Sequence, residues 1–293
     1  MTREAAIVEL AAWLRTPPGH YLLAWEQARL DQAVADMFGF HALQLGLPEL
    51  QGLRANRMPH RWLALDGLSQ AGCDWHASVP PIEGVQSGFS QFGSDSLPVG
   101  PSAAGGASLY CEFDELPFEA ASLDLVVLPH TLEFAPDPHR TLREVERVLR
   151  PEGRLVIAGI NPASAWGLRQ NLGRLHARLP GTSKQLYLPG VGDFIGYWRL
   201  RDWLRLLSFE IDGAQFGAYA PPLKSEKWLT RWQWLEGVGQ RWWPVLGASY
   251  FVSAVKRVHG MRLVGLARQK ARAPKARAAV ALHQHHNQDI HDD

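Results

Sequence analysis

The sequence has few cysteines and no long apolar run. Only two of its 293 residues are cysteine, Cys73 and Cys111, so a disulfide framework is excluded and we expect both thiols to be reduced. No stretch of about 18 apolar residues occurs, which excludes a transmembrane helix. The first residues, Met1-Thr2-Arg3-Glu4, open no apolar signal segment. Together these absences predict a cytoplasmic protein.

Several catalytic and metal-binding patterns are also missing. No G-x-S-x-G is present, which argues against an α/β-hydrolase. No Cys or His cluster has structural-zinc spacing. Gly190-Val191-Gly192 with Gly196 imitates a dinucleotide loop but follows no predicted strand. The histidines near the end could bind a metal, but a solvated tail is the plainer interpretation. These are His283, His285, His286 and His291. We therefore predict no metal site.

Charge is distributed unevenly along the chain. Hydrophobic residues make up 46% and charged residues 20%, which is typical of a folded globular protein. The net charge of +1 conceals two unlike halves. Up to Gly153 there are 10 Lys and Arg against 20 Asp and Glu, and from Arg154 onward there are 20 against 9. Either an anionic partner meets the basic half, or the split reflects surface composition alone.

Apolar periodicity predicts alternating strands and helices. Residues 123–128 form a near-continuous apolar run, typical of a buried parallel strand. Asp137-Pro138 then supplies an N-cap followed by Pro at the first helical position. Strands are predicted over 41–47, 61–65, 108–113, 123–128, 154–160, 209–216 and 261–267, and helices over 4–15, 21–37, 138–149, 200–207 and 225–243. This order predicts an α/β fold with a mostly parallel sheet and right-handed crossovers.

The predicted organisation is one main domain with appended segments. An N-terminal helical segment (1–38) precedes a domain over 39–268, and a basic, His-rich disordered tail follows over 269–293. Residues 76–107 are rich in Gly, Pro and Ser and carry only two charges, so we expect a long flexible loop. Residues 218–260 form a Trp-rich segment that we expect on the substrate side.

A specific motif occupies residues 112–162. It contains Leu116-Pro117-Phe118, the apolar strand, His130-Thr131-Leu132, and a helix that ends in Arg147-Val148-Leu149-Arg150-Pro151-Glu152-Gly153. This block resembles the type 11 family of S-adenosylmethionine-dependent methyltransferases. A weaker similarity over residues 20–268 extends to a YafS-like bacterial subgroup. The resemblance implies a Rossmann-like class I methyltransferase fold with N-terminal helices and a long loop insertion. It also implies S-adenosylmethionine as the cofactor.

The resemblance places a cofactor site at the carboxyl ends of the strands, where open α/β sheets bind ligands. Gly46 would face the cofactor after the first strand, and Asp66 would accept hydrogen bonds from the ribose. The remaining implied contacts follow two later strands: Asp114, Glu115 and Leu116 near the adenine, and His130, Thr131 and Leu132 near the methionine end. No catalytic residue is implied, because methyl transfer needs mainly proximity and alignment.

Each of these positions also has a plainer interpretation. Asp66, followed by Gly67, and Asp114 could simply stabilise turns. Gly46 could mark a strand end, and His130 could be a buried histidine with satisfied hydrogen bonds.

The first turn departs from the family pattern. The family usually has acid-x-G-x-G-x-G there, whereas this chain reads Gln44-Leu45-Gly46-Leu47-Pro48, with one glycine and a proline that donates no amide. Two functions therefore remain open. The first is a methyltransferase acting on a small-molecule acceptor. The second is a non-catalytic binding or regulatory protein on a degenerate methyltransferase fold.

The Trp-rich segment also allows two interpretations. Indoles interleaved with Lys and Arg indicate a cap over an apolar substrate or a peripheral membrane contact. Alternatively, the indoles pack on the domain and the cations face water. No nucleic-acid-binding module is recognisable, so we do not predict a nucleic-acid partner despite the basic second half.

Overall fold

The computed structural model describes residues 3–66, 100–101, 107–176, 186–188, 194–223, 225–232 and 234–257. All of these residues belong to one compact unit, which spans residues 1–258. The predicted tail and the predicted strand 261–267 lie outside the described residues. Of the predicted loop 76–107, only residues 100–101 and 107 are described.

Within the described residues eight strands form one sheet, which is mostly parallel, as the sequence predicts. They are β1 (His41–Leu45), β2 (His60–Leu65), β3 (Gly100–Pro101), β4 (Ala107–Tyr110), β5 (Leu123–Pro129), β6 (Leu149–Ile160), β7 (Phe209–Gly217) and β8 (Ser249–Lys256). Their order is β3-β4-β2-β1-β5-β6-β8-β7. The five strands from β4 to β6 in this order pair in parallel, while β3 pairs antiparallel with β4, and β8 pairs antiparallel with both β6 and β7.

The helices differ from the prediction in several places. They are α1 (Arg3–Leu14), α2 (Pro17–Ala35), α3 (Thr131–Phe134), α4 (Pro138–Val148), α5 (Ala165–His176), α6 (Tyr197–Leu206), α7 (Glu226–Arg231), α8 (Leu235–Trp242) and the short 3₁₀ turn η3 (Pro244–Leu246). Two of them, α3 and α5, are not predicted at all. The first helix ends close to its predicted end, but the predicted start of the second helix at residue 21 is wrong, because α2 already begins at Pro17 and proline is favoured in a first turn. The single helix predicted over 225–243 is wrong, because α7 and α8 are separate.

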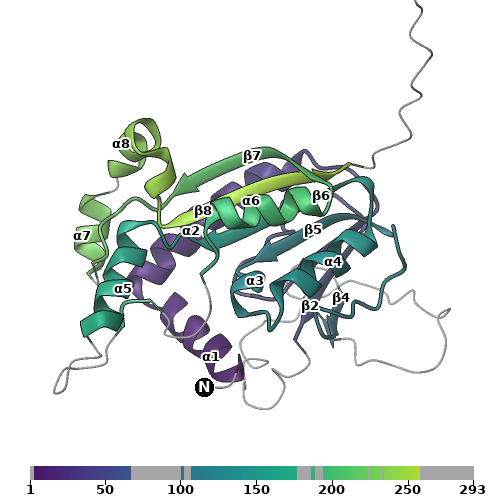
Figure 1. Ribbon diagram of the computed structural model, residues 1–293, viewed down its shortest axis with the longest axis horizontal. Helices are drawn as coiled ribbons and strands as arrows, with labels where there is room; N and C mark the ends of the chain where they lie inside the picture. Colours follow the sequence, from purple (N-terminus) through teal and green to yellow (C-terminus); the bar gives the residue numbers. More distant parts are fainter. Residues whose placement is uncertain are drawn as a thin grey trace, which may run out of the picture. The chain divides into compact units, whose positions relative to one another are not determined.

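Helices cover both faces of the sheet (Figure 1). Leu43 and Val126 pack with α4 and α6 on one face of the sheet. Their neighbours Ala42 and Leu125 pack with α2 on the other face. This alternation is the period-2 geometry of a strand, and burial on both faces explains why these strands have near-continuous apolar sequences.

The strand β8 is the main feature that the sequence prediction missed. The sequence assigns residues 249–256 to the substrate-side segment, but they lie inside the sheet between β6 and β7. Arg154 through Ile160 pair along their whole length with residues 249–255. The antiparallel direction of β8 brings its first residue, Ser249, to the carboxyl end of β6. That position matters for the site described below.

The connection between β5 and β6 has the predicted local chemistry. The Asp137 side chain accepts hydrogen bonds from the backbone amides of His139 and Arg140 at 2.9 and 3.2 Å, and Pro138 occupies the first turn of α4.

The strand order of the sheet reverses between β1 and β5, since β2 lies on one side of β1 and β5 on the other. This reversal is the switch point where α/β folds bind ligands.

Candidate functional site

Gly46 and Asp66 follow neighbouring parallel strands at the carboxyl edge of the sheet. The Gly46 amide donates to the Ala64 carbonyl at 2.7 Å, so the first residue beyond β1 lies beside the end of β2, and Asp66 comes directly after β2. Gly46 has a left-handed φ of 73°. A Cβ at Gly46 would lie 3.6 Å from both the Phe113 ring and the Thr131 hydroxyl. A methyl group at Gly46 would therefore touch both side chains at ordinary van der Waals distance.

The turn after β1 is organised by a side chain instead of by additional glycines. The Gln44 amide nitrogen lies 2.7–3.2 Å from the carbonyl oxygens of Gly46, Leu47 and Leu50. Its amide oxygen accepts from the Gly52 backbone at 2.8 Å. Because Gln44 is buried, these bonds satisfy polar groups that would otherwise lie unpaired in the interior. A glutamine therefore holds this turn where the family has an acid, and the turn remains ordered without the missing glycines.

The residues after β4 differ in how accessible they are. Glu115 is exposed, whereas Leu116 is buried in the core. The Leu116 carbonyl accepts from Arg147 at 3.0 Å. Asp114 lies 3.5 Å from the Arg140 guanidinium of α4. Asp114 and Glu115 are therefore at least partly open to water, while the Leu116 side chain packs in the hydrophobic core.

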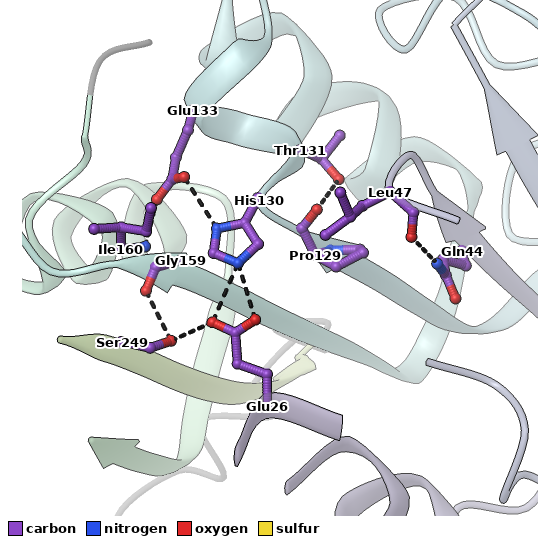
Figure 2. A network of polar contacts seen from close by, with 10 residues as sticks. All are labelled: Glu26, Gln44, Leu47, Pro129, His130, Thr131, Glu133, Gly159, Ile160 and Ser249. Atoms are coloured by element: carbon purple, nitrogen blue, oxygen red, sulfur yellow. Dashed lines mark hydrogen bonds and ion pairs between the residues drawn. The ribbon is translucent and has the colours of Figure 1, made fainter. Parts of the chain in front are cut away.

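His130 bridges two buried carboxylates at the end of β5 (Figure 2). Its Nε2 lies 3.0 Å from Glu26 Oε2, and its Nδ1 lies 3.0 Å from Glu133 Oε2. Glu133 Oε1 accepts from the Ile160 amide at 2.5 Å, and the Ser249 hydroxyl donates to Glu26 Oε1 at 2.6 Å. We call Glu26, His130, Glu133 and Ser249 the buried histidine cluster. It ties α2, β5, β6 and β8 together.

Electrostatics favour an imidazolium in this cluster. Burial by itself would lower the pKa of His130, but the charges and hydrogen bonds of Glu26 and Glu133 outweigh burial and raise that pKa well above its ordinary value. Burial raises the pKa of Glu133, against the opposing pull of His130 and the Ile160 amide. With both nitrogens donating, His130 has no lone pair to offer as a base. The alternative of a satisfied buried histidine describes its side chain correctly.

Thr131 and Leu132 complete the segment after β5. The Thr131 hydroxyl donates to the Leu45 carbonyl at 2.5 Å, which joins the ends of β5 and β1. The Leu132 side chain belongs to the hydrophobic core. The side chains of His130, Thr131 and Leu132 therefore hold the edge together.

One cysteine lies next to the candidate site. The Cys111 amide donates to the Leu65 carbonyl at 3.0 Å, so Cys111 follows β4 beside the end of β2. Burial and then the charge of Asp66 raise the pKa of the Cys111 thiol to about 12. The thiol is therefore protonated near neutral pH and is a poor nucleophile.

Sequence reasoning missed three members of the site. Glu26 lies between the buried residues Leu22 and Leu30 at four-residue spacing, so an acid on the buried stripe of α2 was the available signal. No pattern in the sequence marks Ser249 as part of the site, and none reveals that the Gln44 side chain holds the turn.

Among the described residues there is no cluster of three His, Cys, Asp or Glu side chains that could hold a metal. No helix in this part of the chain is long and apolar enough to span a membrane.

Comparison with known proteins identifies the central segment. Residues 102–157 match the methyltransferase domain family. They include β5, α4 and most of β6, so the resemblance to methyltransferases is confirmed over this block. Gly46 and Asp66 lie outside the matched residues.

A curated relative matches a third of the chain. It is the uncharacterized protein YafS of Escherichia coli strain K12, which is 44% identical over 96 residues. The match covers 33% of this chain and 36% of YafS, so it spans about a third of the relative.

Solved structures extend the likeness to most of the chain. One belongs to the complex between the Haloferax volcanii Trm112 methyltransferase activator and a protein described as a methyltransferase. It has a TM-score of 0.51 at 16% identity and covers 86% of this chain and 97% of its own. A methyltransferase from Thermotoga maritima has a TM-score of 0.46 at 16% identity and covers 80% and 91%. The first comparison shows the fold, which is the Rossmann-like fold of class I methyltransferases.

Proposed function

We propose that this chain binds S-adenosylmethionine and transfers its methyl group to a small-molecule acceptor. The observation that carries the proposal is the placement of Gly46 and Asp66 side by side at the switch-point edge, with a left-handed glycine after β1 and a buried carboxylate after β2. A ligand with an amino-acid end and a ribose needs such a pair. The backbone can approach the ligand closely at the glycine, and the carboxylate can accept hydrogen bonds from the sugar hydroxyls.

The polar groups at this edge suit the cofactor. Asp66 would accept from the ribose, and the backbone at Gly46 would meet the methionine end. Asp114 and Glu115 would lie toward the adenine. From the segment after β5, the backbone of His130, Thr131 and Leu132 would border the methionine end, and Leu116 would contribute backbone near the adenine. When bound, the cofactor would supply an electrophilic methyl group on a sulfonium.

This chain's contribution to the reaction is alignment and electrostatics. The buried histidine cluster fixes α2 and the start of β8 at the same edge, which keeps the surroundings of the site rigid. Two carboxylates facing one imidazolium carry a net negative charge, which favours a cation nearby. We propose no dedicated base, because an in-line displacement depends mainly on positioning the two reactants.

Titration calorimetry of the full chain with S-adenosylhomocysteine, the demethylated cofactor, tests the proposal. We expect saturable binding, and we expect Asp66→Asn to weaken it by about 10- to 100-fold, because hydrogen bonds to a charged group contribute about 1.5–3 kcal/mol. Glu112→Gln is the matched control, since Glu112 is an exposed acid that follows the neighbouring strand β4. If the wild-type chain gives no heat of binding at millimolar ligand, the proposal is overturned.

Turnover needs its own measurement. Transfer of a labelled methyl group to pooled small-molecule acceptors should be detectable and should weaken with Asp66→Asn in step with binding. Saturable binding without transfer to any acceptor class would instead support the non-catalytic function. The low cysteine content, with Cys111 as a free thiol, supports a reducing, cytoplasmic setting for this activity.

A further inference from the structure

The segment from α7 to η3 exposes an unusual amount of apolar surface. Its exposed apolar side chains, which we call the tryptophan face, are Trp228, Trp234, Trp242, Trp243, Val245 and Leu246. Their exposed fractions run from 41% to 69%. Residues 242–246 are five successive apolar residues that all face solvent. Single exposed apolar residues are common, but such a run usually marks a binding surface.

The opposite side of the same segment holds it on the domain. Tyr219 packs against Gly239, and its hydroxyl donates to the Pro244 carbonyl at 2.7 Å. The Tyr219 amide donates to the Glu236 carboxylate at 2.9 Å, and the Tyr21 hydroxyl also contacts that carboxylate. The segment is therefore anchored by residues other than its exposed indoles. The four indoles of the tryptophan face are 50–69% exposed, so at least half of each side chain faces water. Arg231 lies 5.7 Å from the centre of the Trp228 ring, in the kind of cation–π contact that the alternative expects.

A second apolar stripe lies on α5. Leu168, Leu172 and Leu175 are 57–61% exposed at four- and three-residue spacing, so they form one solvent-facing stripe, while Trp166 and Gln170 point inward. The Arg169 guanidinium donates to the Pro222 carbonyl, which ties α5 to the chain leading into α7. Figure 1 shows α5, α7 and α8 in the same region of the described unit.

The charge on these elements is mainly positive. Cations on α5, α7 and α8 are Arg169, Arg174, Lys227, Arg231 and Arg241. The same elements carry only two acids, Glu226 and Glu236, and the second is committed to Tyr21 and Tyr219. A surface of exposed indoles with flanking cations matches an anionic lipid interface, where tryptophan sits at headgroup depth and each cation adds attraction.

We propose that the tryptophan face is a docking surface for anionic lipid bilayers. The indoles of Trp242 and Trp243 enter the interface, and Arg231 and Arg241 contact anionic headgroups. The exposed stripe of α5 adds apolar area. The association is peripheral and reversible, since the surface offers side chains and no spanning helix. The proposal stands apart from methyl transfer, because lipid binding requires no cofactor.

Flotation of the full chain with lipid vesicles tests the proposal. Vesicles of phosphatidylcholine mixed with phosphatidylglycerol should carry the protein at least about tenfold more strongly than phosphatidylcholine alone, and added salt should weaken the binding. Trp242→Ser combined with Trp243→Ser should reduce binding by about tenfold or more. Trp198→Ser is the matched control, because Trp198 is 62% exposed on α6, outside the face. It should bind as the wild type does.

A charge variant and a measurement of oligomeric state distinguish lipid docking by this face from binding by the tail and from self-association. Arg231→Gln with Arg241→Gln should lower affinity for the anionic vesicles and leave the weak binding to neutral vesicles unchanged. The cations of residues 268–277 remain in every variant, so unchanged binding by the double tryptophan variant would assign lipid binding elsewhere and overturn the proposal. Absence of wild-type binding to anionic vesicles would also overturn it. A third result would overturn it as well: the wild type is a dimer in size-exclusion chromatography and binds no vesicles, and only the tryptophan variant is a monomer.

Discussion

The imidazole of His130 donates from Nε2 to the carboxylate of Glu26 across 3.0 Å, and this contact joins the end of β5 to the middle of α2. Both side chains are almost wholly removed from water. An ion pair in such a place is a specific link between elements, because each charge would be strongly disfavoured without the other. The N-terminal helix α2 is thereby fixed against the carboxyl edge that we propose as the cofactor site.

Removing the cation from this cluster should destabilise the fold. We expect His130→Asn to lower the free energy of unfolding by about 3–5 kcal/mol, because Glu26 and Glu133 would then face each other with no cation between them. Asparagine tolerates the left-handed backbone at this position, where φ is 54°, so the loss reports the charge and not backbone strain. Urea unfolding monitored by circular dichroism measures the change.

A surface ion pair provides the control for that measurement. Arg54 pairs with Asp31 through a half-exposed guanidinium, so Arg54→Gln should cost no more than about 1 kcal/mol. Equal losses from His130→Asn and Arg54→Gln would contradict the assignment of a buried, charged histidine.

The same cluster predicts a dependence of stability on pH. The pKa of His130 is raised in the folded state, so its contribution is fully present below the ordinary value of 6.5 and is lost as the pH rises through the folded pKa. Stability should therefore fall as the pH rises above 6.5, by at most about 1.4 kcal/mol per pH unit for this one proton. Urea unfolding at a series of pH values measures this slope.

An NMR titration of the imidazole checks the cause directly. The His130 ring signal, assigned by its disappearance in His130→Asn, should keep its imidazolium shift well above pH 6.5. A midpoint at or below 6.5 would mean that burial outweighs the two carboxylates.

Gly159 should be intolerant of any side chain. A Cβ there would lie 2.5 Å from the Tyr250 hydroxyl and 3.1 Å from Glu133 Oε1, inside the packed interior around the cluster. We expect Gly159→Ala to destabilise the fold by about 1–3 kcal/mol, the usual cost of overpacking a core. Thermal unfolding measures the effect. Gly213→Ala is the matched strand control because nothing lies within 4 Å of its Cβ position, and it should be close to neutral.

Gly46 should matter more for the ligand than for folding. Alanine at a φ of 73° costs about 1–2 kcal/mol of backbone strain, which urea unfolding would report. Its methyl group would also prevent the ligand from approaching the backbone closely at this position, so affinity for S-adenosylhomocysteine should fall by about tenfold or more. Affinity equal to that of the wild type, measured by calorimetry on the folded variant, would show that the ligand does not approach Gly46.

Local patterns in the sequence predict the centre of the fold well. The strand at 123–128, the capped helix that follows and the strand at 154–160 all form, because burial on both faces and an Asp-Pro cap leave clear marks. The same local logic places the start of the second helix too late, at residue 21, since Pro17 and Pro18 separate two helices and also begin the second one.

Relationships between distant residues leave weaker marks. The pairing of β8 with β6 joins residues about a hundred positions apart, and no periodicity in Ser249–Lys256 reveals the partner. The buried histidine cluster likewise unites Glu26 with Ser249, 223 positions away. The sequence places His130 at the correct edge but does not reveal that both ring nitrogens are committed to carboxylates.

A crystal structure of the full chain with S-adenosylhomocysteine tests the central claim most directly. We predict that the ribose hydroxyls lie within hydrogen-bonding distance of the Asp66 carboxylate and that the amino-acid end meets the backbone at Gly46, with the buried histidine cluster intact behind it. A ligand bound away from both residues, or a His130 side chain turned out of its cluster to contact the ligand, would contradict the proposed site.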